Sequence, residues 1–218
     1  LQLLPKLKFW ESEAELFDLA QLALGLGPLF AVIVLGSNLY NGWRHMYFIY
    51  PSLLYLGVVA WQQIRRQTKL RTKTVVSTLL ILNLLSVGHF MYRYHPNQQV
   101  YFNALAGSDR TKRYDMDYWG LSYFTALKKI VEETPDGEKT AVTSHDPTCF
   151  YNCKYLPPEM KAKLHYDFTG EEAKYYLSTF RRPKHHDNFF NQVPPHDRPH
   201  FFIRVEGEPI VGVFKLEE

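Results

Sequence analysis

Acidic residues are missing from a long stretch of this sequence: between Asp18 and Asp109 the chain has no Asp and no Glu. The same stretch contains three long apolar runs, Leu19–Leu35, Met46–Trp61 and Val75–Tyr92. Each run would form a helix of roughly 25 Å, slightly short of a hydrocarbon core of about 30 Å, and flanking Tyr, Trp, Gln and Thr residues would extend it. The mean hydropathy of −0.27 conceals this segment, because it averages two unlike halves.

Three buried helices of a soluble protein are the alternative interpretation of these runs. The runs are apolar on every face, however, whereas a helix at a protein surface has a polar stripe. Aromatic residues gather at the ends of the runs, as in membrane aromatic belts: Tyr40, Trp43, Tyr47, Tyr50, Trp61, Tyr92 and Tyr94. We therefore predict a membrane segment over residues 1–94, with three transmembrane α-helices at about 19–35, 46–64 and 74–92.

Basic residues cluster between the second and third runs, where five of them fall within nine positions: Arg65, Arg66, Lys69, Arg71 and Lys73. By the positive-inside rule this loop faces the cytoplasm, so residues 36–45 and everything after residue 94 lie outside. The expected partner of the basic loop is the lipid bilayer with its anionic headgroups. The outer part carries sixteen basic and eighteen acidic residues, and this near neutrality argues against nucleic acid.

Cysteine is scarce, since Cys149 and Cys153 are the only two. An extracytoplasmic location permits a disulfide between them, worth roughly 2 kcal/mol or less because the loop is so short. The sequence leaves this disulfide open. A metal site would need these cysteines with histidines from a set that matches no standard zinc spacing: His185, His186, His196 and His200. We therefore expect solvated loop histidines, no metal site and no cofactor.

Alternating patterns in residues 95–218 predict a small extracytoplasmic α/β domain. A helix is expected at Ser122–Glu133, because its apolar residues share a face and Pro135-Asp-Gly137 stops it. Strands are expected at Thr140–Ser144, Lys163–Phe168 and Ala173–Phe180, followed by a closing hairpin of Phe201–Val205 and Ile210–Leu216. The segments Asp146–Pro158 and Arg181–Pro199 are predicted to be loops.

Common enzyme motifs are also missing: the chain has no Gly-rich phosphate loop, no G-x-S-x-G and no H-E-x-x-H. A different cluster, Trp43-Arg44-His45, follows the first run at the expected depth of the outer headgroups. Arg44 is the only charged residue between Asp18 and Arg65, and a guanidinium can hold two phosphate oxygens at once. The cluster is a candidate site for a lipid phosphate, or alternatively an interfacial anchor that snorkels to any headgroup.

Several motifs resemble the C-terminal part of bacterial family 39-type glycosyltransferases, polytopic GT-C enzymes similar to protein mannosyltransferases and to the aminoarabinose transferase of lipid A. They are Tyr40–Pro51, His95-Pro96 with Val100–Asn103, Tyr114–Tyr123, and the ending Ile203–Lys215. The resemblance implies transfer of a sugar from a polyprenyl-phosphate donor to an acceptor outside the bacterial cytoplasmic membrane. The donor phosphate would then bind Trp43, Arg44 and His45.

The expected catalytic acid of such enzymes lies on the first extracytoplasmic loop, and that part of the family has no counterpart in this chain. The outer loop at residues 36–45 has no carboxylate, although a hydroxyl acceptor needs a base. Asp115 and Asp117 are the nearest acids, and they could equally cap the helix at Ser122 or bind a divalent cation. We expect no catalytic residue in this chain, and sugar or acceptor contacts from Asp117, Tyr118 and Trp119.

Two functions follow from these expectations. The first is the C-terminal portion of a membrane glycosyltransferase, and the start at Leu1 rather than Met favours a piece of a longer protein. The second is a non-catalytic membrane subunit, a degenerate or split relative kept for assembly. The expected partners are a polyprenyl-phosphate-linked sugar and the N-terminal helices of the same protein or of a partner subunit. What precedes Leu1 in the gene distinguishes the two.

Overall fold

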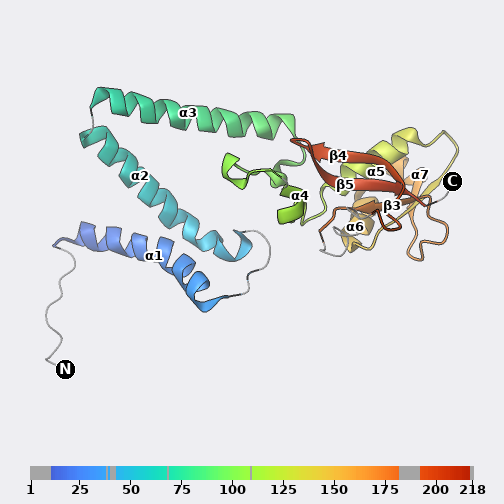
Figure 1. The fold of residues 1–218 in the computed structure, drawn as a ribbon, viewed down its shortest axis with the longest axis horizontal. Coiled ribbons are helices and arrows are strands. Elements are labelled where there is room, and N and C mark those ends of the chain that lie inside the picture. The colour runs from blue at the N-terminus through green and yellow to red at the C-terminus, as the bar shows by residue number, and fades with distance from the viewer. Residues whose placement is uncertain are drawn as a thin grey trace. The chain divides into compact units, whose positions relative to one another are not determined.

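The structure is a computed structural model that describes residues 11–37, 39, 43–67, 69–108, 110–181 and 192–216. It divides into two compact units (Figure 1), which we call the helical unit, Leu1–Leu84, and the α/β unit, Leu85–Glu218. The boundary falls earlier than residue 94, inside the helix α3 (Leu70–Arg93). The reason is that Phe90, near the end of α3, is buried in a cluster of the α/β unit.

Helices α1 (Glu13–Leu35) and α2 (Tyr50–Gln67) form the helical unit together with the start of α3. A short 3₁₀ helix, η1 (Trp43–Ile49), leads directly into α2. Helix α1 begins before its apolar run, because the Ser12 side chain accepts a hydrogen bond from the Glu15 N–H and acids occupy the first turn. Predicted helices are therefore present at all three apolar runs, with shifted boundaries.

Two of these helices, α1 and α3, are long and apolar enough to cross a membrane. Their apolar side chains face outward, with Ile33 at 78% and Leu84 at 62% exposure. Helix α2 has 18 residues, and Arg65 and Arg66 lie in its last turn, so its apolar part is shorter. It is tied to α1 by the Tyr55 hydroxyl, which donates to Asp18 Oδ1 at 2.5 Å.

Five strands form one mixed sheet in the α/β unit, in the order β2-β1-β3-β5-β4. Strands β1 (Thr140–Thr143), β2 (Leu164–Tyr166) and β3 (Tyr175–Ser178) are parallel. Strands β4 (Pro199–Val205) and β5 (Glu208–Lys215) form an antiparallel hairpin, and β5 also pairs antiparallel with β3. The predicted strands and the closing hairpin are confirmed. The hairpin turns at Glu206 and Gly207, both with positive φ, as a tight two-residue turn requires.

Helix α5 covers Ser122–Glu133, the residues predicted from the sequence. The prediction of a loop at Asp146–Pro158 is wrong, because α6 (Pro147–Tyr155) fills most of it and α7 (Pro158–Ala162) follows directly. Asp146 caps α6 and Pro147 occupies its first turn, which are strong signals for a helix start. The described residues between α3 and α5 contain the short helices η2 (Gln98–Val100), η3 (Ala104–Ala106) and α4 (Arg110–Arg113).

The core of the α/β unit lies on both faces of the sheet. On one face α5 and α6 pack against alternate strand residues, a cluster that includes Leu127, Cys149, Val142, Leu177 and Val213. The opposite face carries an aromatic cluster of Tyr176, Phe180 and Phe214. A third cluster joins the end of α3 to the hairpin: Phe90, Val100, Met116, Val205 and Ile210. Phe180 follows β3 and belongs to the aromatic cluster, so the packing extends into the loop after that strand.

Candidate functional site

The carboxyl ends of β1 and β3 form the candidate site. The chain leaves β1 toward β2 on one side and then returns past β1 to β3 on the other, and the two strands are parallel neighbours. Such a reversal of strand order leaves a crevice outside the carboxyl ends of the strands, where open α/β sheets commonly bind ligands. We call the residues at this crevice the β1/β3 edge.

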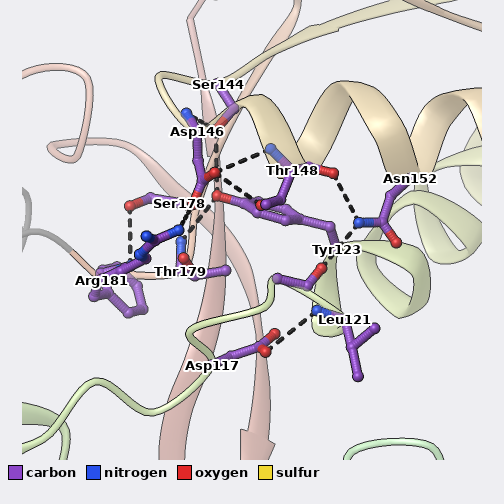
Figure 2. A network of polar contacts seen from close by, with 12 residues as sticks. Asp117, Leu121, Tyr123, Ser144, Asp146, Thr148, Asn152, Ser178, Thr179 and Arg181 are labelled. Atoms are coloured by element: carbon purple, nitrogen blue, oxygen red, sulfur yellow. Dashed lines mark hydrogen bonds and ion pairs between the residues drawn. The ribbon is translucent and has the colours of Figure 1, made fainter. Parts of the chain in front are cut away.

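The loop after β1 contributes Ser144, His145 and Asp146 to the β1/β3 edge. Asp146 Oδ1 accepts hydrogen bonds from the Thr148 N–H at 3.0 Å and from the Thr148 hydroxyl at 2.8 Å, so this oxygen caps α6. Its second oxygen, Oδ2, lies 4.0 Å from a guanidinium nitrogen of Arg181. The carboxylate therefore has one structural oxygen and one that faces the crevice (Figure 2).

The end of β3 and the residues after it supply the opposite side, with Ser178, Thr179 and Arg181. Between them Phe180 has a φ of 59°, in the left-handed region that bulky side chains rarely adopt. Its ring is buried in the aromatic cluster, which holds the strained backbone in place. The sharp change of direction at Phe180 lets Arg181 turn back toward Asp146.

Tyr123, on α5, forms the floor of the β1/β3 edge. Its hydroxyl accepts a hydrogen bond from the Thr179 N–H at 3.2 Å and lies 3.2 Å from the Ser144 hydroxyl oxygen (Figure 2). Burial raises the pKa of Tyr123 well above its usual value, and the charges of Cys149 and Asp146 add to the rise. The hollow above it has a volume of about 10 Å³, roughly the room for one water. A larger ligand would therefore lie on the rim.

Aromatic side chains from the loop before α5 form this rim. The Arg181 guanidinium carbon lies 3.9 Å from the centre of the Tyr118 ring, a close cation–π contact. Trp119 meets Tyr118 edge to face, with ring centres 5.2 Å apart, and is 53% exposed. The rim thus combines an exposed indole, a phenol ring, a guanidinium and a carboxylate.

Asp117 has a structural position instead. It is fully buried, and its carboxylate accepts hydrogen bonds from the N–H groups of Leu121 and Ser122 and from the Ser122 hydroxyl. The Gln99 amide donates to it as well, at 3.3 Å. The alternative that this acid caps the helix at Ser122 is thereby confirmed. A direct sugar contact from Asp117 does not fit a side chain with 0% exposure.

Gly120 fixes the loop that carries Tyr118 and Trp119. Its φ is +66°, and a Cβ at this position would overlap the Thr148 side chain on α6. Its carbonyl accepts a hydrogen bond from the Asn152 amide at 3.0 Å. The Tyr114–Gly120 motif therefore divides into anchoring residues, Asp117 and Gly120, and two outward aromatic residues.

The predicted phosphate cluster lies in the helical unit, at the start of η1. Arg44 and His45 are exposed there, while Met46 and Ile49 are buried. The side chain of Trp43 lies outside the described residues. The two sets of predicted site residues thus belong to different units, and each is described within its own unit.

Cys149 and Cys153 are free and buried, one turn apart on α6, so the disulfide that the sequence leaves open is not formed in this structure. Burial is the main cause that raises the pKa of the Cys149 thiol well above its usual value. Both side chains pack in the core cluster under the sheet. They act here as small apolar core residues.

The histidines do not gather into a metal site among the described residues, where no group of three or more metal-binding side chains occurs. His196 is buried against the rings of Tyr176 and Phe214 rather than solvated as expected. His200 Nε2 lies 2.7 Å from a carboxylate oxygen of Glu133. His185 and His186 lie outside the described residues.

Sequence reasoning missed Ser144, His145, Asp146 and Arg181 as site residues. The available signal was a short buried strand followed by Ser-His-Asp-Pro, because polar residues after a parallel strand commonly meet at its carboxyl edge. Arg181 had no comparable signal, since the turn at Phe180 that directs it depends on tertiary packing. Comparison with protein-family models, with curated proteins and with solved structures finds no match to this chain.

Proposed function

We propose that this chain is the C-terminal portion of a bacterial membrane glycosyltransferase that moves a sugar from a polyprenyl-phosphate donor to an extracytoplasmic acceptor. In this proposal α1, α2 and α3 all cross the cytoplasmic membrane. The basic cluster from Arg65 to Lys73, which the structure places mainly at the end of α2 and the start of α3 rather than in a loop, faces the cytoplasm, and the α/β unit lies outside. The resemblance of the sequence motifs to family 39-type enzymes is the origin of the proposal.

The exposed apolar surface of α1 and α3 supports the membrane part of the proposal. Side chains such as Phe30, Ile33 and Leu79 are exposed to more than half of their area, which water would disfavour and lipid tails would not. Helix α2 is shorter in its apolar part, but its Arg65 and Arg66 can extend to the cytoplasmic headgroups. The three helices then fit one orientation.

The single observation that carries the sugar-binding part is the rim of the β1/β3 edge. Trp119 is exposed, and Arg181 is held between the Tyr118 ring and the Asp146 carboxylate. Aromatic faces suit the apolar faces of sugar rings, while a guanidinium and a carboxylate hydrogen-bond to hydroxyl groups. We assign this rim to the sugar or to a glycan acceptor.

Arg44 and His45 remain our candidates for the donor phosphate, with Trp43 beside them. Their exposure at the start of η1 agrees with this role. A matched substitution separates it from simple anchoring: Arg44→Lys keeps charge and length but loses bidentate geometry. In the complete enzyme we expect about a tenfold or larger loss of rate, from roughly 1–3 kcal/mol of lost binding. If Arg44→Lys leaves the rate and the donor KM unchanged, the proposal that Arg44 binds the donor phosphate is wrong.

A catalytic base is not assigned in this chain. Asp117 is buried as the cap of α5, and Asp146 caps α6 with one of its oxygens. General-base assistance is typically worth about 10²–10⁴-fold, so the chain alone should not turn over a polyprenyl-phosphate sugar. The base is expected on N-terminal helices of the same protein or on a partner subunit.

The second candidate, a non-catalytic membrane subunit, is favoured by the same engaged carboxylates and by an exposed aromatic patch. Tyr151, Tyr155 and Phe168 are each more than half exposed, and Phe150 packs against the Phe168 ring at 4.9 Å. Exposed aromatic residues of this kind are enriched in protein interfaces. In that case the α/β unit would contact a partner protein instead of a sugar.

The test is transfer from a radiolabelled polyprenyl-phosphate sugar by the natural protein, with everything that its gene encodes, in proteoliposomes. Trp119→Ala and Arg181→Gln should each raise the KM of the acceptor or donor sugar by about tenfold or more. Tyr155→Ala, at an equally exposed aromatic residue outside the rim, is the control and should have no effect. If both rim variants keep wild-type activity, the assignment of the rim to the sugar is wrong. If only Tyr155→Ala loses assembly with a partner, the result favours the non-catalytic subunit as the function.

A further inference from the structure

A second hollow of the α/β unit lies at the end of α3. It has a volume of about 350 Å³ and is lined by the last turns of α3, by the loop around Tyr101–Gly107, by Arg110 and by Glu206 of the hairpin turn. We call it the α3 pocket. None of its residues belongs to the β1/β3 edge, so the proposed sugar site leaves it unexplained.

Positive charge dominates the lining of the α3 pocket. Arg93 and Arg110 carry permanent charges, and Glu206 is the one acid in the lining. The lining itself holds two guanidinium groups and one carboxylate, while Glu208 lies beside Arg110 outside the lining. Such a lining recognises an anion that can accept several hydrogen bonds.

Arg110 is held in place by neighbours that leave part of it unused. A guanidinium nitrogen of Arg110 lies 2.5 Å from a Glu206 carboxylate oxygen, and the backbone N–H of Arg110 donates to Glu208 Oε1 at 3.1 Å. The side chain is 13% exposed, and its Nε is buried without a hydrogen-bond partner among the described residues. An orphaned charged donor of this kind is costly unless a ligand or water accepts from it.

The walls around these charges are aromatic and preformed. Phe90, Tyr94, Tyr101 and Phe102 line the pocket, and Phe90 packs against Tyr94 and Tyr101 with ring centres 4.9 and 5.0 Å apart. Arg113 braces the adjoining loop by donating to the carbonyls of Ala106 and Ser108. The pocket therefore does not need to be built by its ligand.

The position of the pocket on α3 identifies the source of the anion. Arg93 is the last residue of this helix, directly after the apolar run that is long enough to cross a membrane. An Arg at that point lies at the depth of the lipid phosphates if α3 spans the bilayer. A phosphate monoester carries a charge of about −1.5 to −2 and three acceptor oxygens, which suits two guanidinium groups better than a carboxylate does.

We propose that the α3 pocket binds the phosphate monoester of a membrane lipid between Arg93 and Arg110. This inference goes beyond the proposed function, because it needs α3 in the membrane but no glycosyl transfer. Glu206 competes with the ligand for Arg110. The carboxylate thus limits the affinity, and its removal should strengthen binding.

The experiment is native mass spectrometry of the full chain in detergent, titrated separately with phosphatidic acid, phosphatidylcholine and inorganic phosphate. Phosphatidic acid should bind. Phosphatidylcholine and inorganic phosphate should each bind with an affinity that is at least about tenfold lower. Arg93→Gln should weaken phosphatidic acid binding by about tenfold, and Glu206→Gln should strengthen it several-fold. Lys128→Gln removes an exposed positive charge of the same unit outside the pocket and should change nothing.

Four results would overturn the proposal. Equal affinity in Arg93→Gln would show that the pocket is not used, and an equal loss in Lys128→Gln would show non-specific attraction. Weaker binding in Glu206→Gln would show that the ion pair with Arg110 supports the fold rather than competes with the lipid. Inorganic phosphate that binds as tightly as phosphatidic acid would exclude a lipid source. Since Arg93 is exposed, its variant folds even if changes at Arg110 do not.

Discussion

The two units of this chain use the same apolar side chains in opposite ways. In the helical unit Ile33 and Leu35 are exposed to 78% and 75% of their area, whereas Leu127 and Val142 in the α/β unit are fully buried. At about 25 cal/mol per Å², exposure of this kind is unfavourable in water. The α/β unit completes its own core, and the helical unit needs an apolar environment from elsewhere. In our proposal a membrane supplies that environment, since α1 and α3 are long and apolar enough to cross one.

The largest expected effect is the loss of stability when a side chain is added at Gly120, in the packed interior of the α/β unit. Gly120→Ala adds a Cβ that overlaps Thr148 and forces a positive φ on alanine, so it should destabilise the α/β unit by about 3 kcal/mol. Thermal unfolding of the full chain measures this. Gly137→Ala is the control, because Gly137 also has a positive φ but open space around it, and about 1 kcal/mol is expected. Equal losses at both positions would contradict the proposed packing of the Gly120 loop.

Next in size is the response of the two units to charge at an exposed leucine. Leu82→Arg in α3 should reduce membrane insertion at a cost of about 2.5–3.5 kcal/mol if this helix crosses lipid. Leu105→Arg makes the same change at a leucine of the α/β unit that is 94% exposed, and it should have no effect. Resistance to alkaline extraction from membranes is the readout. Full resistance of Leu82→Arg would place this face of α3 in water.

The two acids of the Asp-x-Asp motif should differ as well. Asp117→Asn weakens a buried cap that accepts from the backbone and hydroxyl of Ser122, and a loss of about 2 kcal/mol in unfolding free energy is expected. Asp115→Asn, at the exposed acid of the pair, should stay within about 0.5 kcal/mol. Urea unfolding of both variants measures these two losses in unfolding free energy. If Asp115→Asn costs as much as Asp117→Asn, the distinction between the two acids fails.

The smallest effect is a local pH dependence after β2. A hydrogen bond from the Thr169 hydroxyl, followed by one from the Glu172 N–H, lowers the pKa of Asp167 to about 2 from an ordinary 3.8. The ionised carboxylate therefore stabilises the 167–172 loop above about pH 4, and this contribution disappears as the pH falls toward 2. NMR titration of the Asp167 carboxyl should give this low midpoint, and Thr169→Ala should raise it. A midpoint near 3.8 in the unmodified protein would refute the loop geometry.

Apolar periodicity and helix-ending residues in the sequence made several elements of the α/β unit predictable. Helix α5 matched its predicted residues because its apolar face has a clear 3.6-residue period and Pro135 ends it. Helix α6 escaped prediction, because Cys, Phe, Tyr and Asn give it weak helix propensity and only its Asp-Pro start indicates a helix. The order of strands and the strained turn at Phe180 depend on contacts between distant segments, which no local pattern records.

The candidate site was only partly predictable for the same reason. The sequence predicts Tyr118 and Trp119 as sugar or acceptor contacts; the Tyr118 ring stacks on Arg181 at the β1/β3 edge, and Trp119 packs against Tyr118. Asp117 has the same sequence environment, yet it is turned inward by four hydrogen bonds. Which side of a loop faces inward is decided by the elements that it packs against. Here those elements are α5 and α6.

The orientation of the helical unit in the membrane can be tested most directly by single-cysteine labelling. In a background with Cys149 and Cys153 changed to Ala, Ser37→Cys lies after α1 and Lys69→Cys lies in the basic loop. An impermeant maleimide added to intact bacterial cells should label Ser37→Cys at once and Lys69→Cys only after the membrane is opened. Labelling of Lys69→Cys in intact cells, with Ser37→Cys protected, would contradict the proposed membrane topology.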